Sequence, residues 1–236
     1  MAVLDKDEVS SEILRITLNR PNSLNALNGE LLAGIADTVR SANGEYTVLI
    51  FEGAGRAFTA GADLDAAKEE GGENIDLFQD ITRAVREFEG IVVGKLHGWV
   101  VGGGFEWTLS FDLRYAATDT TFKMTESEIG VTISNASTLL LPLTVGAGKA
   151  RELVFTSREV SANEAERLGL IAGVYDDADL DEKVLSVAED IVENKSRTAL
   201  WLNKRGFNHA FPVEEVLEYE EVANLLCDEL SGEIEW

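Results

Sequence analysis

The stretch Gly98-Trp-Val-Val-Gly-Gly-Gly-Phe-Glu106 decides how the rest of the chain is interpreted. It closes the apolar run 91–101, IVVGKLHGWVV, which predicts one strand that ends at the glycines. Glycines at such a turn let backbone N–H groups face a ligand without interference from side chains. If a helix begins within the turn, these N–H groups lie at its positive end. The turn therefore predicts either a ligand-facing set of donors or close strand–helix packing, since both need glycine.

A second glycine-rich turn is Gly53-Ala-Gly-Arg-Ala-Phe-Thr-Ala-Gly-Ala-Asp-Leu64, which follows the predicted buried strand 47–53. Two such turns, brought side by side, would aim two N–H donors at one oxygen and form an oxyanion hole. Loss of one donor from such a hole typically lowers the rate by about 10²–10³. The same glycines would also serve close packing, so the residues alone leave both interpretations open.

Two glutamates are candidate catalytic groups. Glu106 closes its turn after an apolar segment and before Trp107, so we expect it to point into a partly dry place. Glu126 follows the predicted strand 120–124, and Glu128 is an equal local rival. A carboxyl group in dry surroundings has a raised pKa, and paired carboxyl groups can divide acid and base roles between them.

The composition restricts the class of protein. The 236 residues include 43 acids and 20 bases, which give a net charge of −23. This balance argues against a nucleic-acid binder and against an anionic membrane as partner. The sequence shows no apolar run near the ~20 residues of a membrane helix and no secretory signal layout. Its one cysteine, Cys227, predicts a packing residue, and we expect a soluble, cytoplasmic protein.

The negative charge itself has two interpretations. It indicates either an acidic face for a basic partner or acids spread over the whole surface, as in proteins adapted to a salty cytosol. The acids are dispersed, with no run of six or more like charges. This distribution favours salt adaptation, because molar salt shortens the Debye length to ~3 Å and screens the repulsion.

The order of predicted elements indicates the fold class. Strands are predicted over 12–18, 47–53, 91–101, 111–118, 120–124 and 171–176. Helices are predicted after Asn28, which can cap the first of them, within 64–89, and over 179–193, 196–209 and 213–230. Strands and helices alternate first, and helices follow. This order predicts an α/β core over residues 1–179 and a C-terminal helical region over residues 180–236.

Two apparent motifs fail. Residues 53–58 begin like a dinucleotide-binding fingerprint, but Phe58 stands at its third glycine. Residues 146–149, GAGK, resemble a phosphate loop but lack its first glycine and its final hydroxyl residue. His97 has no nucleophile elbow to serve and predicts a histidine packed at a strand end. With no Cys/His cluster, we expect no metal site.

The residues resemble the crotonase family, the enoyl-CoA hydratases and isomerases. Three segments match in order and spacing: LNRPNSLNAL (18–27), AFTAGADL (57–64) and GWVVGGGFE (98–106). A fourth, VSANEAERLGLI (160–171), resembles the helix before the last core strand of the family. The resemblance covers essentially the whole chain.

The resemblance implies a crotonase-like ββα spiral core and a C-terminal helical oligomerisation region that builds trimers, often paired into hexamers. In the family, an oxyanion hole holds the thioester carbonyl of an acyl-CoA substrate. By match to the motifs, the N–H groups of Ala62 and Gly103 would form this hole. Ala60, Asp63 and Leu64 would lie along the CoA.

The resemblance also implies a reaction. Hydratases of the family use two glutamates to add water across a 2-enoyl-CoA, and these match Glu106 and Glu126. A glycine at the spacing of Gly130 favours Glu126 over Glu128. Water would give its proton to the α-carbon and its oxygen to the β-carbon. CoA is part of this substrate, so no separate cofactor is expected.

The phosphates of CoA would meet a strongly acidic chain, so nearby basic side chains must compensate. Arg20 and Arg56, beside the matched motifs, and Lys204 and Arg205 are the candidates. Their alternative is an ordinary surface charge.

One segment departs from the family. Where hydratases commonly carry a turn rich in proline and glycine, this chain has Thr132-Ile-Ser-Asn-Ala-Ser137. We expect Ser134 or Asn135 to cap the next helix, although they could instead bind a substrate group or the reacting water. The departure leaves open an isomerase, a hydrolase, a hydratase-lyase or an inactive CoA-binding protein.

Salt adaptation leads to a first prediction. Raising potassium chloride from about 0.1 M to about 1 M should stabilise the protein, because the salt screens repulsion among its acids. We expect a gain of about 1 kcal/mol or more, or roughly 2–4 °C in Tm for a chain of this size. Thermal unfolding followed by circular dichroism measures it. A constant or falling Tm would contradict salt adaptation.

Overall fold

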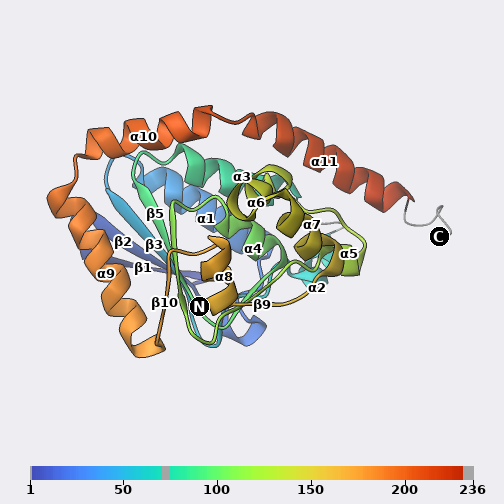
Figure 1. Ribbon diagram of the computed structural model, residues 1–236, viewed down its shortest axis with the longest axis horizontal. Helices are drawn as coiled ribbons and strands as arrows, with labels where there is room; N and C mark the ends of the chain where they lie inside the picture. Colours follow the sequence, from blue (N-terminus) through green and yellow to red (C-terminus); the bar gives the residue numbers. More distant parts are fainter. Residues whose placement is uncertain (1, 71–74, 231–236) are drawn as a thin grey trace.

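Two β-sheets form the framework of the computed structural model, which describes residues 2–70 and 75–230 (Figure 1). The larger sheet has the order β1-β2-β3-β5-β7-β10, with bounds Leu4–Ser10, Ile13–Leu18, Val48–Gly53, Ile91–Leu96, Leu113–Ala117 and Gly173–Tyr175. The smaller sheet has the order β4-β6-β8-β9, with bounds Ala57–Thr59, Trp99–Val101, Thr121–Lys123 and Val160–Ser161. The β1–β2 and β8–β9 pairs are antiparallel and the other pairs are parallel.

The chain advances as a spiral. Strands β3, β5 and β7 of the larger sheet are each followed at once by a strand of the smaller sheet, β4, β6 and β8 respectively. A helix comes after each of these strand pairs. The predicted ββα spiral is therefore confirmed, and each passage of the chain between the sheets brings a turn to the same region.

The helices fall into two groups along the chain. Those of the spiral are η1 Pro21–Ser23, α1 Gly29–Ala42, α2 Leu64–Glu70, α3 Ile75–Glu87, α4 Gly102–Thr108, α5 Glu126–Ile129, α6 Ser137–Val145, α7 Ala147–Thr156 and α8 Ala162–Leu168. The C-terminal helices are α9 Asp177–Asn194, α10 Arg197–His209 and α11 Val213–Leu230. As predicted, Asn28 caps α1, since its Oδ1 accepts the Leu31 N–H at 3.1 Å.

Alternation along β3 shows why the larger sheet is covered on both faces. Leu49 and Phe51 point into the main core with α1 and α3, whereas Val48 and Ile50 point into a second core. That second core is closed by the apolar stripe of α9, which includes Leu180, Val184, Ala188 and Ile191. Burial on both faces accounts for the continuous apolar run in this parallel strand.

The C-terminal helices wrap the outside of the molecule. Figure 1 shows α10 and α11 following one another along one side, and α9 covers one face of the larger sheet. Because α9 packs on the larger sheet, its first residues belong to the same packed body as the spiral. A division into domains at residues 179 and 180 stays a prediction.

Two features differ from what the sequence predicts. The run 91–101 is expected to form one strand, but it forms β5 and β6 in different sheets, because the backbone turns at Gly98 with φ of +55°. A Cβ there would lie 2.0 Å from the Arg56 carbonyl oxygen, so only glycine fits. The N-terminal strand β1 has no clear signal in the sequence, since four of its seven residues are charged and most of it is exposed.

The three glycines that open α4 are required for three separate reasons. Gly102 has φ of +54°, which favours glycine, and a Cβ there would lie 2.9 Å from Glu126 Oε1. At Gly103 a Cβ would lie 2.7 Å from the Phe78 ring. At Gly104 it would lie 2.1 Å from Thr59 Cγ2. The triple glycine thus lets α4 begin against α3, α5 and β4 at once.

This packing predicts that Gly104→Ala destabilises the fold. The added methyl group would collide with Thr59 in a closed core, and such overpacking typically costs about 1–3 kcal/mol. Gly148→Ala is the matched control, because Gly148 is also helical but a Cβ added there would meet nothing within 4 Å. It should be neutral or stabilising by up to about 1 kcal/mol. Urea unfolding compares them, and equal stability of the two variants would show that the Thr59 contact does not limit position 104.

Candidate active site

The two glycine-rich turns lie against each other. Gly61 has φ of +89°, and a Cβ there would lie 2.8 Å from the Val101 carbonyl oxygen and 3.5 Å from the Gly102 Cα. The turns after β4 and β6 therefore meet backbone to backbone, with no side chain between them. The sequence left open whether the glycines serve packing or ligand-facing donors, and this contact shows that they serve packing.

The same contact also brings Ala62 and Gly103 to one cavity. Leu27 bonds to both neighbours of Ala62, accepting the Asp63 N–H at 3.0 Å and donating to Gly61 O at 2.8 Å. In a parallel bridge this turns the N–H of Ala62 to the opposite side. Gly103 lies in the first turn of α4, where N–H groups have no partner within the helix. Both residues line a cavity of about 230 Å³.

Asn25 holds the loop that carries Ala62. It is fully buried, and its Nδ2 donates to the carbonyl oxygens of Ala54 and Ala57 at 2.8 Å each. Its Oδ1 accepts the Arg20 N–H at 2.8 Å, and its carbonyl oxygen accepts the Thr59 hydroxyl at 2.8 Å. The asparagine therefore joins the 18–27 segment to both ends of the connection between β3 and β4.

Arg20 and Asp63 form an ion pair at 2.9 Å, and Arg20 also donates to the Ala26 carbonyl oxygen. Asp63 Oδ1 accepts the Ala66 N–H at 3.2 Å, so this carboxylate also holds the start of α2. Although burial alone would raise the pKa of Asp63, the Ala66 N–H and Arg20 together lower it. The side chains of these two predicted substrate-binding residues thus pair with each other and hold the loop.

The other residues predicted to lie along the CoA separate into two groups. Ala60 and Leu64 line the cavity, and the Leu64 side chain is exposed at its edge. Arg56 is exposed next to the Gly98 turn and does not line the cavity.

Glu106 is fully buried at the cavity wall. Its Oε2 accepts the Ser134 N–H at 2.7 Å, the Ser134 hydroxyl at 2.6 Å and the Asn135 amide at 3.4 Å. Burial raises the pKa of Glu106 well above its usual range, and the negative charge of Glu126 raises it further. The hydrogen bonds from Ser134 oppose this rise. A carboxyl group with a raised pKa at a cavity wall is a candidate acid–base group.

Glu126 lines the same cavity from the first turn of α5 and is 6% exposed. Glu128, the rival in the sequence, stands at the rim with half of its side chain exposed and pairs with Lys123 at 2.8 Å. The structure thus brings Glu106 and Glu126 together in a dry place and leaves Glu128 toward solvent.

The expected cap of α6 by Ser134 or Asn135 is wrong. Both side chains turn to Glu106 instead. The carboxylate of Glu220, on α11, takes the capping position, since it accepts the N–H groups of Ala136 at 2.7 Å and Thr138 at 2.9 Å. Burial raises the pKa of Glu220 to about 7, although these bonds oppose the rise.

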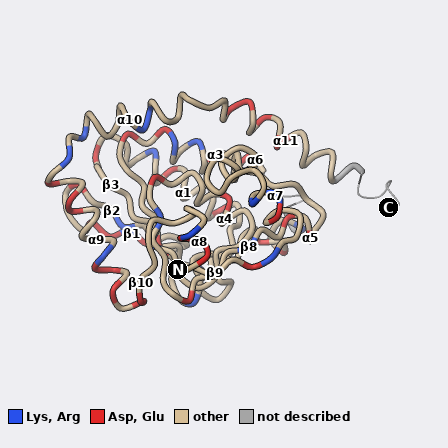
Figure 2. Tube along the Cα trace, in the orientation of Figure 1, with Lys and Arg blue, Asp and Glu red and all other residues tan. Residues whose placement is uncertain are grey.

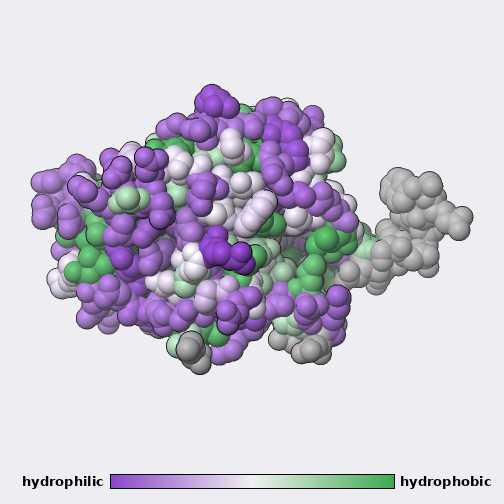
Figure 3. All heavy atoms as spheres, turned by 90° about the horizontal axis from the view of Figure 1, so that it is seen from below, coloured by the Kyte–Doolittle hydropathy of each residue, from purple (hydrophilic) through white to green (hydrophobic). Residues whose placement is uncertain are grey.

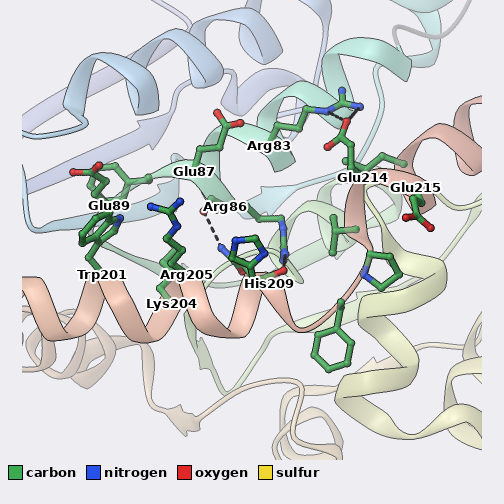
Figure 4. Close-up of a pocket in the computed structure, with 16 residues that line it drawn as sticks. Arg83, Arg86, Glu87, Glu89, Trp201, Lys204, Arg205, His209, Glu214 and Glu215 are labelled. Carbon is green, nitrogen blue, oxygen red and sulfur yellow. Dashed lines mark hydrogen bonds and ion pairs between the residues drawn. The ribbon is translucent and has the colours of Figure 1, made fainter.

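Lys204 does not reach the candidate site. It is 5% exposed and donates to the Gly90 carbonyl oxygen at 3.0 Å and to Asp112 at 2.8 Å. Figure 4 shows it in a second cavity, of about 610 Å³, between α3 and the α10–α11 segment. Arg205 lines this second cavity and lies over the Trp201 ring. The prediction that Lys204 binds substrate is therefore corrected to a structural role within this chain.

In the described part of the chain, no group of three His, Cys, Asp or Glu side chains is placed to hold a metal. The His97 ring nitrogen lies 3.1 Å from the Gly55 carbonyl oxygen, as expected for a histidine at a strand end. Over the same described residues, no helix is long and apolar enough to span a membrane.

Comparison with known proteins agrees with this geometry. A family profile described as "Enoyl-CoA hydratase/isomerase" matches residues 8–229. The chain belongs to the enoyl-CoA hydratase/isomerase family. It is 32% identical to a short-chain-enoyl-CoA hydratase of Clostridium acetobutylicum, over 92% of this chain and 86% of that protein.

Two more members of the enoyl-CoA hydratase/isomerase family are similar over nearly their whole length. A crotonyl-CoA hydratase of Syntrophomonas wolfei is 32% identical, over 95% of this chain and 88% of that protein. The crystal structure of an enoyl-CoA hydratase/isomerase from Pseudoalteromonas atlantica superposes with a TM-score of 0.87 at 30% identity, covering 97% of this chain and 92% of that one.

Sequence reasoning missed two contributors to the site of this hydratase/isomerase-family chain. Asn25 lies inside the matched segment 18–27, and a buried amide next to a tight turn could have been suspected from that position. Glu220 carried no local signal, because it is one of 43 acids on a helix with many others. Glu220 is buried by contacts with Ala136 and Thr138, which precede it by more than 80 residues in the chain.

The ion pair predicts different effects for two arginines of this family member. Arg20→Gln should lower the free energy of unfolding by about 1–3 kcal/mol, because it leaves the mostly buried Asp63 carboxylate without its charged partner. Arg56→Gln should change it by less than about 0.5 kcal/mol, since Arg56 is exposed. Urea unfolding at constant salt measures both. Equal losses in the two variants would contradict the assignment of Arg20 to the loop.

Proposed function

We propose that the protein is an enoyl-CoA hydratase that adds water across the 2,3 double bond of an acyl-CoA thioester. One observation carries the proposal: Glu106 and Glu126 line one cavity with Ala62 and Gly103, the residues whose N–H groups we propose as the oxyanion donors. The hydratase names of the relatives at 32% identity support it.

The chemistry follows from this arrangement. The thioester carbonyl oxygen accepts the N–H groups of Ala62 and Gly103, which stabilise the negative charge that develops there. A water molecule is held by the two glutamates. Its oxygen forms the bond to the β-carbon as one carboxylate takes its proton, and the α-carbon receives a proton from the glutamate pair. The product is a 3-hydroxyacyl-CoA, and the glutamates return to their starting protonation state.

The substrate would enter along the residues between β4 and α2. Ala60 and Leu64 line the cavity, so the pantetheine part of CoA would run past them. Arg56 is exposed near this segment and is the remaining candidate for the phosphates, because Arg20 is already paired with Asp63. CoA arrives as part of the substrate, so the proposal includes no separate cofactor.

A second reaction of the family is double-bond isomerisation, which the family description includes. An isomerase needs a group that moves a proton between carbons, whereas hydration needs water held between two acid–base groups. The burial of both Glu106 and Glu126 at one cavity favours hydration.

We also propose that the protein is a homotrimer or a dimer of trimers. The support is the apolar surface on the C-terminal helices: Tyr219, Val222, Leu225 and Leu226 on α11 and Leu202 and Phe207 on α10 are exposed. Figure 3 shows that most of the face seen from below is hydrophilic, with separate hydrophobic patches.

A salty cytosol is proposed as its environment. The acids in Figure 2 are spread along most of the chain, on helices and loops alike, rather than gathered into one segment. Such a distribution suits screening by salt better than docking of a single basic partner.

The test of the proposed function is hydration of crotonyl-CoA, followed by the loss of absorbance of the conjugated thioester. Glu106→Gln and Glu126→Gln should each lower kcat by about 10² or more, the typical contribution of general acid–base catalysis. Glu128→Gln is the matched variant and should lose less than about threefold, since its carboxylate stands at the rim.

Three results would overturn the proposal. The first is a wild-type protein that binds CoA thioesters but hydrates no enoyl-CoA across short, long and aryl chains. The second is full activity in Glu126→Gln, which indicates a mechanism with one glutamate. The third is a greater loss in Glu128→Gln than in Glu126→Gln, which assigns the second role to the other residue.

A further inference from the structure

The segment 132–137 stands where the family commonly has a proline- and glycine-rich turn, and its residues Thr132 and Ser134 line the cavity beside Glu106. Ser134 is 6% exposed, and its N–H and hydroxyl both donate to the same oxygen, Oε2, of the Glu106 carboxyl group. The Asn135 amide adds a longer bond of 3.4 Å to that oxygen. All three donors reach one oxygen of the carboxyl group.

The donors belong to a chain of hydrogen bonds that starts on α3. The buried Thr82 hydroxyl donates to Asn135 Oδ1 at 2.8 Å, which turns the Nδ2 of that amide toward the site. Nδ2 then donates to Ser134 Oγ at 3.0 Å, and Ser134 Oγ donates to Glu106 at 2.6 Å. Each bond fixes the orientation of the next group, so the direction of the serine hydroxyl is determined.

The backbone of this segment is unusual. Asn135 and Ala136 have φ of +58° and +59°, a left-handed conformation that is unfavourable for a residue with a Cβ such as Ala136. Such conformations persist only where surrounding contacts hold them. Thr82 holds Asn135, and Glu220 accepts the Ala136 N–H at 2.7 Å. The conformation brings the Ser134 N–H and hydroxyl onto one carboxyl oxygen.

From this geometry we propose that Ser134 is a positioning residue for Glu106, supported by Asn135. The inference rests on the proposed hydratase function. Ser134 binds Oε2 and fixes the plane of the carboxyl group, so Oε1, the oxygen that Ser134 does not bind, is the one proposed to meet the reacting water. Its two hydrogen bonds also favour the ionised form of Glu106, which is the form that takes a proton from water.

The charged groups around Glu106 are few among the residues that the structure describes. Glu126 on α5 faces it and disfavours its ionisation. Glu128 lies at the rim and pairs with Lys123, and Glu220 lies behind the loop with its carboxylate on the N-terminus of α6. No cation is among the groups that shift the pKa of Glu106, so the neutral donors of Ser134 supply the stabilisation of its charge.

The experiment compares Ser134→Ala with Ser137→Ala. Removal of the Ser134 hydroxyl should move the acid limb of the kcat/KM pH profile up by about one unit, because a hydrogen bond to a charged group is lost. At a pH on that acid limb, kcat should fall by about tenfold with KM changed less than about threefold. Ser137 is equally buried, but its hydroxyl has no hydrogen-bond partner within the described residues, so Ser137→Ala should match the wild type.

Two further variants keep the test decisive. Ser134→Thr retains a hydroxyl and should restore the wild-type pH profile. Thr82→Val removes the first bond of the chain at nearly constant volume and should shift the acid limb in the same direction by a smaller amount. If Ser134→Ala does not fold, the test depends on Thr82→Val. An unchanged acid limb in Thr82→Val would then overturn the proposal.

An infrared titration separates this inference from the proposed function. The carboxyl band of Glu106, identified by its loss in Glu106→Gln, should titrate at higher pH in Ser134→Ala than in the wild type. This measurement needs no substrate, so it stands even if no enoyl-CoA is hydrated. An unchanged band and pH profile in Ser134→Ala, an effect on KM alone, or an equal shift in Ser137→Ala would each overturn the positioning role.

Discussion

The structure depends on the contact between two backbone turns, one after β4 and one after β6. Gly61 and Gly102 meet there with no room for a side chain, and both have positive φ. Because each turn follows a strand of the smaller sheet, the parallel pairing of β4 with β6 sets how the turns approach. Ala62 and Gly103 then line one cavity as a consequence of how the spiral closes. The N–H donors proposed for the oxyanion hole and the core packing would therefore depend on the same backbone contact.

A second constraint is the burial of two carboxyl groups in a chain that already carries 23 excess negative charges. A buried charge is costly unless it is paired or hydrogen-bonded, and a second like charge beside it adds to the cost. The groups that shift the pKa of Glu106 include Glu126 and Ser134 but no cation. The protein uses neutral donors instead, which stabilise the charge without removing its ability to bind a proton. A paired arginine would hold the carboxylate ionised and weaken it as a base.

Local constraints were predictable from the sequence, and long-range ones were not. The glycines of 98–106 and the cap at Asn28 follow from backbone geometry that a few residues define, so the turns and α1 could be predicted. Lys204 was misassigned because a charge on a helix does not reveal whether it points inward, and here it finds Asp112 in the core. Ser134 was expected to cap a helix because its neighbours allow it, but its partner is 28 residues away.

Long-range contacts also connect the C-terminal helix α11 to the candidate site, although only Asn224 of that helix lines the cavity. The left-handed Ala136 follows Asn135, and its N–H is held by Glu220 of α11. Thr138 donates to the other oxygen of that carboxylate through both its N–H and its hydroxyl. Gln79 of α3 ties α11 in place by donating to the Leu217 carbonyl oxygen at 2.6 Å. A helix with apolar residues on its outer face thus holds the loop whose Ser134 bonds to Glu106, so the orientation proposed for that carboxyl group depends on α11 as well.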